Sequence, residues 1–98
     1  MHIQYRRPKI EALVETRAGA AKYPPEIVDR LFEVLDVIAA ASEEKQLYQF
    51  KGLRYELLRG KRKGEASMRL NDQWRLIVAV HEDSEGFFAE IIDIEDYH

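Results

Sequence analysis

The stretch SMRLNDQWRLIV, from Ser67 to Val78, reads as two β-strands joined by the short polar sequence Asn-Asp-Gln. Asn and Asp are typical turn residues, and the residues on both sides of them suit strands. The stretch therefore predicts a β-hairpin. Its register decides which side chains share a face, because a shift by one residue turns every side chain to the opposite face.

The hairpin can form in two registers. With a loop of two residues, Arg69 would lie opposite Trp74, and each face would mix charged with large apolar side chains. With a loop of three residues, Met68 lies opposite Leu76 and Arg69 lies opposite Arg75. Three-residue hairpin loops are common, and Asn or Asp tolerates their left-handed conformation. We predict the second register, because it gathers the apolar side chains, Trp74 included, on one face and both arginines on the other.

The predicted pairing of Arg69 with Arg75 carries an electrostatic cost. Like charges directly opposite each other destabilise a strand pair. An acidic neighbour or an anionic ligand must offset this cost. Arginine suits phosphate, because its planar donor fork can bind two oxygens at once. The hairpin alone leaves both explanations open.

The N-terminal half predicts a short strand followed by two helices. Residues 2–7 alternate in polarity as a strand does. Residues 8–17 place apolar residues at helical spacing behind a proline that suits a helix start. Residues 22–42 predict a longer helix, because their two prolines lie near its beginning and their apolar residues form one stripe. Residues 41–52 read as a connector.

The C-terminal half changes to the alternating pattern of strands. It predicts strands at 53–58, 65–70, 74–82 and 87–95. The order of one strand, two helices and a meander predicts an α+β fold, in which two N-terminal helices pack on one face of a small twisted antiparallel sheet. The length of 98 residues predicts a single domain over residues 1–98.

Composition excludes several classes of protein. The chain has no cysteine, which excludes disulfides and thiolate metal sites. Its N-terminus has no apolar signal core, and no apolar run approaches the length of a membrane span. We therefore expect a cytoplasmic protein without a membrane partner.

Charge is distributed unevenly along the chain. Residues 51–75 contain eight Lys or Arg against three Asp or Glu, which is a net of +5 in a protein whose net charge is -3. Residues 82–98 contain seven acidic residues and no Lys or Arg. A basic segment in an acidic protein indicates a focused anion site. A solvated hairpin with lysines at its tip would give the same pattern.

A longer pattern carries a family resemblance. The stretch LRYELLRGKRKGEASMRLNDQWRLIV and the terminal AEIIDIEDYH contain, in order, a leucine-rich strand, a basic residue before Gly, an Arg two residues later and another Gly. A strand ending in Arg-hydrophobic-Asn-Asp-Gln-Trp-Arg and a final Asp-Tyr-His follow. The combination resembles the HigB-type (proteic killer) branch of the RelE superfamily of toxins. It covers roughly the C-terminal half.

The resemblance implies a function and partners. HigB-type toxins are ribosome-dependent mRNA endonucleases that cut the codon in the ribosomal A site, where mRNA and rRNA surround them. Each is encoded beside a HigA-type helix-turn-helix antitoxin that neutralises it. The family fold is a small twisted antiparallel sheet with two helices on one face. Cleavage needs no metal or cofactor, and the acidic end residues Asp93, Glu95 and Asp96 offer no second ligand cluster.

The resemblance also assigns catalytic candidates. Metal-free RNA cleavage by the 2′-hydroxyl needs a base, cations that hold the charge developing on phosphorus, and an acid for the leaving oxygen. Arg69 and Arg75 would hold the scissile phosphate, and Tyr97 and His98 are the acid–base candidates. Glu56 stands near the position of a histidine in some members, so it could act as a base or pair with an arginine.

Five further residues are candidates for RNA binding. They are Arg59, Lys61, Arg62, Lys63 and Gln73. Arg59 replaces a lysine of several relatives and cannot donate a proton at ordinary pH, so its role would be electrostatic. Arg62 would contact the RNA backbone or support its own loop, and Gln73 would bond a base or orient the substrate. Lys61 stands where many relatives carry Asp or Asn.

Two other readings remain open. One is a catalytically inactive RNA- or ribosome-binding module of the same fold, which would bind ribosomes without cutting. The other is an interaction protein whose basic hairpin binds only an acidic partner.

Overall fold

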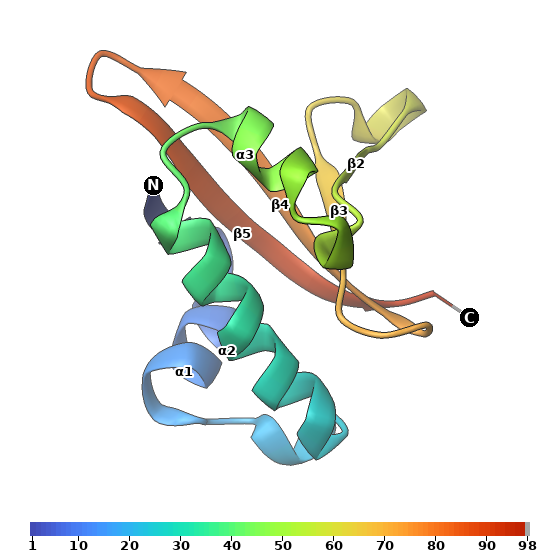
Figure 1. Ribbon diagram of the computed structural model, residues 1–98. Helices are drawn as coiled ribbons and strands as arrows, with labels where there is room; N and C mark the ends of the chain where they lie inside the picture. Colours follow the sequence, from blue (N-terminus) through green and yellow to red (C-terminus); the bar gives the residue numbers. More distant parts are fainter. Residues whose placement is uncertain (98) are drawn as a thin grey trace.

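The computed structural model describes residues 1–97, and these residues form a five-stranded sheet in the order β1-β5-β4-β3-β2 (Figure 1). The strands are β1 (His2–Tyr5), β2 (Glu56–Leu57), β3 (Ala66–Arg69), β4 (Trp74–Asp83) and β5 (Gly86–Asp96). The α-helices are α1 (Pro8–Thr16), α2 (Pro25–Ala40) and α3 (Glu44–Gln49). Short 3₁₀ turns lie at η1 (Ala20–Lys22), η2 (Lys51–Leu53) and η3 (Gly60–Arg62). The predicted α+β class is confirmed.

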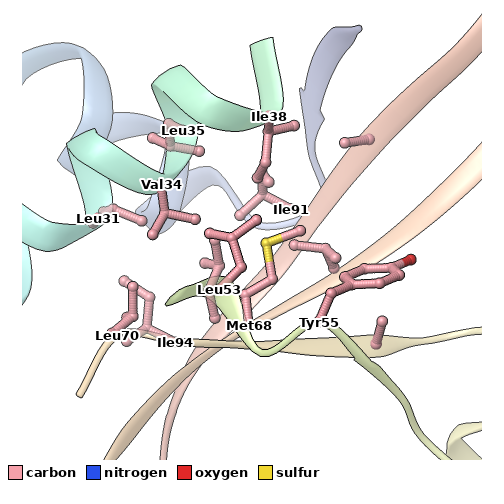
Figure 2. Close-up of a cluster of buried hydrophobic side chains, with 14 of the residues drawn as sticks. Leu31, Val34, Leu35, Ile38, Leu53, Tyr55, Met68, Leu70, Ile91 and Ile94 are labelled. Atoms are coloured by element: carbon pink, nitrogen blue, oxygen red, sulfur yellow. The ribbon is translucent and has the colours of Figure 1, made fainter. Parts of the chain in front are cut away.

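The main core lies between the sheet and the helices. Helix α2 begins directly after Pro24, as predicted, because proline suits the first turn and has no N–H to lose there. Figure 2 shows side chains of α2 facing those of the central strands. The labelled residues of this contact are Leu31, Val34, Leu35 and Ile38 from α2, Met68 from β3, and Ile91 and Ile94 from β5. Ile10 and Leu13 of α1 join the same cluster.

One strand differs from the predicted antiparallel sheet. Strands β2 to β5 are antiparallel, but β1 pairs with β5 in parallel, with Ile3 opposite Ala89. Parallel neighbours need a long connection, and here all the other elements lie between them in sequence. The alternating pattern of β1 predicts a strand but contains no information on its direction.

The predicted connector also contains regular structure. Residues 41–52 include α3 and part of η2, because Leu47 is fully buried and anchors a short helix to the core. The strand predicted at 53–58 shrinks to two residues, Glu56 and Leu57. Leu53 and Tyr55 are buried in the main core instead, and Arg54 between them adopts a left-handed backbone with φ 47°.

The predicted hairpin register is confirmed. Met68 lies opposite Leu76 and Arg69 lies opposite Arg75. The side chain of Asn71 closes the turn, because its Oδ1 accepts hydrogen bonds from the backbone N–H groups of Gln73 and Trp74, both at 2.8 Å. The Trp74 ring packs on the main core and meets Tyr23 edge-on at 5.6 Å, in agreement with its predicted core role.

The opposite face of the sheet, here called the outer face, carries the charged side chains. A register shift in the β4–β5 pair places Ile77 opposite Asp93 and Val78 opposite Ile91, which leaves Ile92 as an extra residue. Ile77 and Ile92 form a small second cluster, against which Leu58 packs. The loop after β2 is therefore anchored to the outer face.

Candidate functional site

The two arginines of the hairpin lie side by side on the outer face, at the β3–β4 turn. Arg69 Nη2 donates a hydrogen bond to Asp72 Oδ1, and the Arg69 side chain is 33% exposed. Arg75 Nη1 donates to the backbone oxygen of Asn71 and to that of Trp74, the latter at 3.2 Å. A guanidinium has more N–H donors than these bonds use. Both arginines are therefore held by the turn, and both keep donors for an anion.

Asp72 is the acidic neighbour that offsets part of the like-charge cost. Its side chain is 97% exposed and lies at the tip of the turn. The hydrogen bond from Arg69 and the charge of that arginine lower the pKa of Asp72, and the charges of Arg75 and Arg54 lower it further. The charges of three arginines thus act on this one carboxylate.

Tyr97 lies against the arginine pair. Its ring is 5.3 Å from Arg75 Cζ, and its backbone N–H donates to the oxygen of Gln73 at 2.6 Å. Gln73 Nε2 in turn donates to Asp96 Oδ2 at 3.0 Å. The end of β5 is therefore fastened to the hairpin turn. His98, the other acid–base candidate, lies outside the described residues.

Glu56 lies on the same face as the arginines. It stands opposite Ser67 in the β2–β3 pair, and Ser67 shares its face of β3 with Arg69, two residues along the strand. Its side chain is exposed and makes no hydrogen bond or ion pair with any residue from 1 to 97. Glu56 therefore has a carboxylate that no arginine among residues 1–97 binds.

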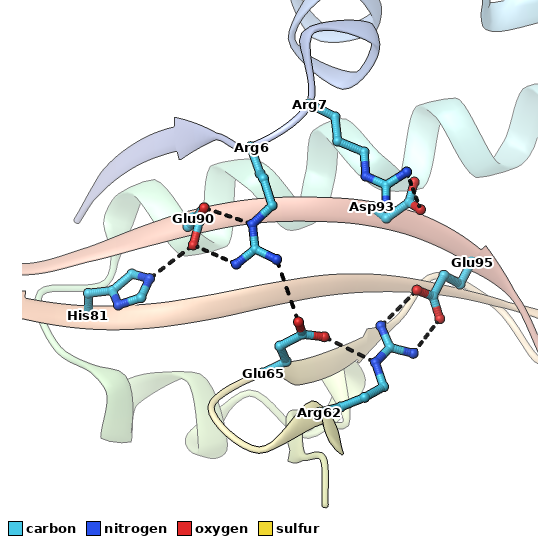
Figure 3. A network of polar contacts seen from close by, with 8 residues as sticks. All are labelled: Arg6, Arg7, Arg62, Glu65, His81, Glu90, Asp93 and Glu95. Carbon is cyan, nitrogen blue, oxygen red and sulfur yellow. Dashed lines mark hydrogen bonds and ion pairs between the residues drawn. The ribbon is translucent and has the colours of Figure 1, made fainter. Parts of the chain in front are cut away.

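Arg62 differs from the other basic residues of its loop. Its Nη1 and Nη2 donate to both carboxylate oxygens of Glu95 at 2.8 and 2.7 Å, and its Nε donates to Glu65 at 3.0 Å. The hydrogen bonds to Glu95 are the main cause of the raised pKa of Arg62. Arg62 thus ties η3 to β5 (Figure 3). Of the two roles considered for it, this geometry matches loop support.

Three predicted RNA-binding residues of the same loop remain exposed. They are Arg59, Lys61 and Lys63. None of them makes a side-chain hydrogen bond or ion pair within the described chain. They lie along the loop that Arg62 fastens to the sheet, so their charges extend the positive surface beyond the arginine pair.

The acidic residues of β5 pair with arginines from far away in sequence. Arg6 bonds Glu90 at 3.0 and 3.1 Å and lies 3.6 Å from Glu65, and Arg7 lies 3.4 Å from Asp93 (Figure 3). The bond from Arg6, followed by one from His81, lowers the pKa of Glu90. Within the described residues, no group of acidic and histidine side chains is placed to hold a metal ion.

A family comparison identifies the type of protein. Residues 4–98 match the family of HigB-like toxins, described as the RelE-like toxin of type II toxin–antitoxin system HigB. Toxin HigB-1 of Vibrio cholerae is 34% identical over 77 residues, which cover 79% of this chain and 81% of that protein. The chain belongs to the HigB-like toxin family. As a toxin of a toxin–antitoxin system, it is expected to have an antitoxin partner.

Solved structures of RelE-like toxins share the fold of this HigB-like toxin. The YoeB/ParE toxin of Agrobacterium tumefaciens matches with a TM-score of 0.61 at 13% identity, over the full length of both chains (100% of each). YafQ of E. coli matches with a TM-score of 0.60 at 15% identity, over 96% of this chain and 90% of that one. YoeB of Staphylococcus aureus in its YoeB–YefM complex matches with a TM-score of 0.54 at 19% identity, over 100% of this chain and 97% of that one. These likenesses show the fold.

One residue of the site in this HigB-like toxin was not singled out from the sequence. Arg54 counts among the basic residues of 51–75, but no motif marks it. Its placement depends on the burial of Leu53 and Tyr55 on either side and on its left-handed backbone. A strand at 53–58 would have hidden this geometry, so only the fold reveals it. No helix among residues 1–97 is long and apolar enough to cross a membrane.

Proposed function

We propose that this toxin is a ribosome-dependent mRNA endonuclease that cuts the A-site codon through attack of the 2′-hydroxyl on the neighbouring phosphate. The observation that carries the proposal is the pairing of Arg69 with Arg75 on the outer face, where each keeps unused donors. The match to the HigB-like family supports it.

The residues around the pair suit the steps of this reaction. The 2′-oxygen gives its proton to a base and bonds to phosphorus, and the 5′-oxygen leaves with a proton from an acid. The products are a 2′,3′-cyclic phosphate and a 5′-hydroxyl. Glu56, unpaired within the described chain, would be the base, and Tyr97 beside Arg75 would be an acid together with His98. Arg69 and Arg75 would stabilise the negative charge that develops on phosphorus.

Charge gives a physical reason for dependence on the ribosome. The whole chain has a net charge of -3, so it lacks the general attraction to RNA of a basic protein. Cations without an ion pair among residues 1–97 include Arg75 at one end of the sheet and Arg59, Lys61 and Lys63 along the 59–63 loop. A substrate presented in a fixed position by the ribosome would compensate for weak binding of free RNA. We further propose a cytoplasmic location and a HigA-type helix-turn-helix antitoxin as the partner.

Expression with and without the neighbouring gene tests this function. We expect growth arrest without the antitoxin, and primer extension on a translated message should show ends within codons. Arg75→Ala should abolish both, whereas Lys22→Ala, on η1, should preserve them. Ribosome co-sedimentation without cleavage by the parent chain would instead indicate the inactive binding module.

A further inference from the structure

The arginine site already contains an anion of the protein itself. Asp72 Oδ1 accepts a hydrogen bond from Arg69, and the charge of Arg75 also acts on this carboxylate. The turn does not need this carboxylate for its shape, because Asn71 Oδ1 already binds the N–H groups of Gln73 and Trp74. Asp72 thus interacts with the arginines rather than with the backbone of its own turn.

A third arginine acts on the same carboxylate. In the antiparallel β2–β3 pair, Glu56 lies opposite Ser67. Arg54 precedes Glu56 by two residues and Arg69 follows Ser67 by two, so Arg54 lies at the same end of this strand pair as Arg69. The charge of Arg54 also contributes to the lowered pKa of Asp72. Leu53 and Tyr55, 1% and 7% exposed, anchor the backbone on both sides of Arg54. Its left-handed conformation, uncommon for a residue with a side chain, lets both neighbours reach the core while Arg54 stays exposed. Its side chain makes no hydrogen bond with another described residue.

We infer that Asp72 is a resident counter-anion which an RNA phosphate displaces, and that Arg54 is the third arginine of the phosphate site. The inference rests on the proposed function, since it takes RNA as the ligand. An exposed ion pair is weak, so its displacement costs little. A phosphate group offers more oxygens to converging guanidinium groups than one carboxylate does, and its charge replaces the one that leaves.

A purely structural role of Asp72 predicts a different outcome. In the free protein Asp72 reduces repulsion among three arginines, so its loss should leave the fold the same or slightly less stable. If Asp72 competes with phosphate, the same loss strengthens RNA binding. Tighter binding without a gain in stability is therefore the signature of a counter-anion, because a carboxylate that merely orders the site would weaken binding when removed.

Binding of an RNA that cannot be cut tests the inference on the full chain. The probe is a fluorescent pentanucleotide with 2′-O-methyl groups, measured by anisotropy at several salt concentrations. We expect Asp72→Asn to bind it about three- to fivefold more tightly. Asp36→Asn is the matched control, an exposed aspartate on α2 whose neutralisation should change affinity much less. Asp72→Ser is a second test of the same position, should the asparagine variant fold poorly.

Arg54 is tested with the same probe and its own control. We expect Arg54→Gln to weaken binding about three- to tenfold and to lower the salt dependence. Arg17→Gln is the matched control, because Arg17 also has a left-handed backbone, at φ 63°, and its guanidinium lies over Phe32 at 4.2 Å. Equal effects of the two variants would overturn the role of Arg54.

The outcomes separate the inference from the proposed function. Unchanged or weaker binding by Asp72→Asn, or no measurable binding by either parent or variant, overturns the inference. Tighter binding by Asp72→Asn in a chain that never cuts translated mRNA would refute the proposed function and support the inference. Cleavage by the parent together with unchanged RNA binding by Asp72→Asn would support the proposed function and refute the inference.

Discussion

Two groups of arginine on the outer face of the sheet differ in how their donors are used. Arg62 gives three hydrogen bonds to two carboxylates, those of Glu65 and Glu95. At the turn, Arg69 donates to the carboxylate of Asp72, whereas Arg75 donates to backbone oxygens. In register Glu95 lies opposite Arg75, but its carboxylate binds Arg62.

The comparison shows that the ratio of arginines to carboxylates distinguishes structural from functional arginines on one surface. Where carboxylates match or outnumber arginines, the donors are satisfied and the ion pairs hold the loop to the sheet. Where arginines outnumber carboxylates, donors and positive charge remain for a ligand. A basic residue in the sequence does not reveal which case applies, because the deciding carboxylates lie far away along the chain.

The largest effect is expected from the arginine pair. Arg75→Ala should reduce cleavage of translated mRNA about 100-fold or more, because it removes a cation that stabilises the charge on phosphorus. The free energy of unfolding should change little, since the hydrogen bonds of Arg75 within residues 1–97 go to backbone oxygens of the turn. Quantified primer extension and thermal unfolding measure the two quantities. Cleavage at the parental rate would show that the pair is not the phosphate site.

Removal of Arg62 should instead reduce the stability of the fold. Arg62→Ala should lower the free energy of unfolding by about 1 kcal/mol, because the partly buried Glu95 loses its partner and Glu65 loses one of its two. The neighbouring Lys63→Ala is the control and should leave stability unchanged, because Lys63 has no ion pair with another described residue. Denaturant titration measures both. Similar stabilities for the two variants would mean that the Arg62 bonds contribute nothing to the fold.

Acid should weaken the ion pair between Arg62 and Glu95. The bond from Arg62 lowers the pKa of Glu95 below its ordinary value of 4.5, so the folded state binds fewer protons than the unfolded state near that pH. The contribution of Glu95 is fully present above pH 4.5 and is lost as pH falls through the lowered pKa. Glu95→Gln should therefore be less stable than the parent at neutral pH, and the difference should shrink in acid. A difference that is constant with pH would contradict this linkage.

The smallest effect is expected from the exposed lysines. Lys61→Ala and Lys63→Ala should each weaken binding of the uncleavable RNA about twofold and reduce its salt dependence, because each removes one solvated charge. Anisotropy at several salt concentrations is the measurement. Lys45→Ala on α3, whose ammonium pairs with Glu43, is the control. A loss as large as that of Arg75→Ala would place the phosphate site in the loop instead.

Much of the fold could be predicted, because local patterns carry it. Apolar spacing marked α1 and α2, and the match of apolar faces selected the register that pairs Arg69 with Arg75. The direction of β1 and the short helix α3 could not be predicted in this way. A strand pattern is the same in both directions, and α3 depends on the burial of one leucine, Leu47.

The sequence by itself determined the hairpin, its register and the family of this toxin. These follow from neighbouring residues, whose polarity and turn chemistry act over short distances. Only the tertiary structure decided which arginines form ion pairs with carboxylates. It brings Glu95 to Arg62 across 33 positions of the chain, and the burial of Leu53 and Tyr55 leaves Arg54 exposed between them. Ion pairing depends on distance in space, which no local pattern specifies.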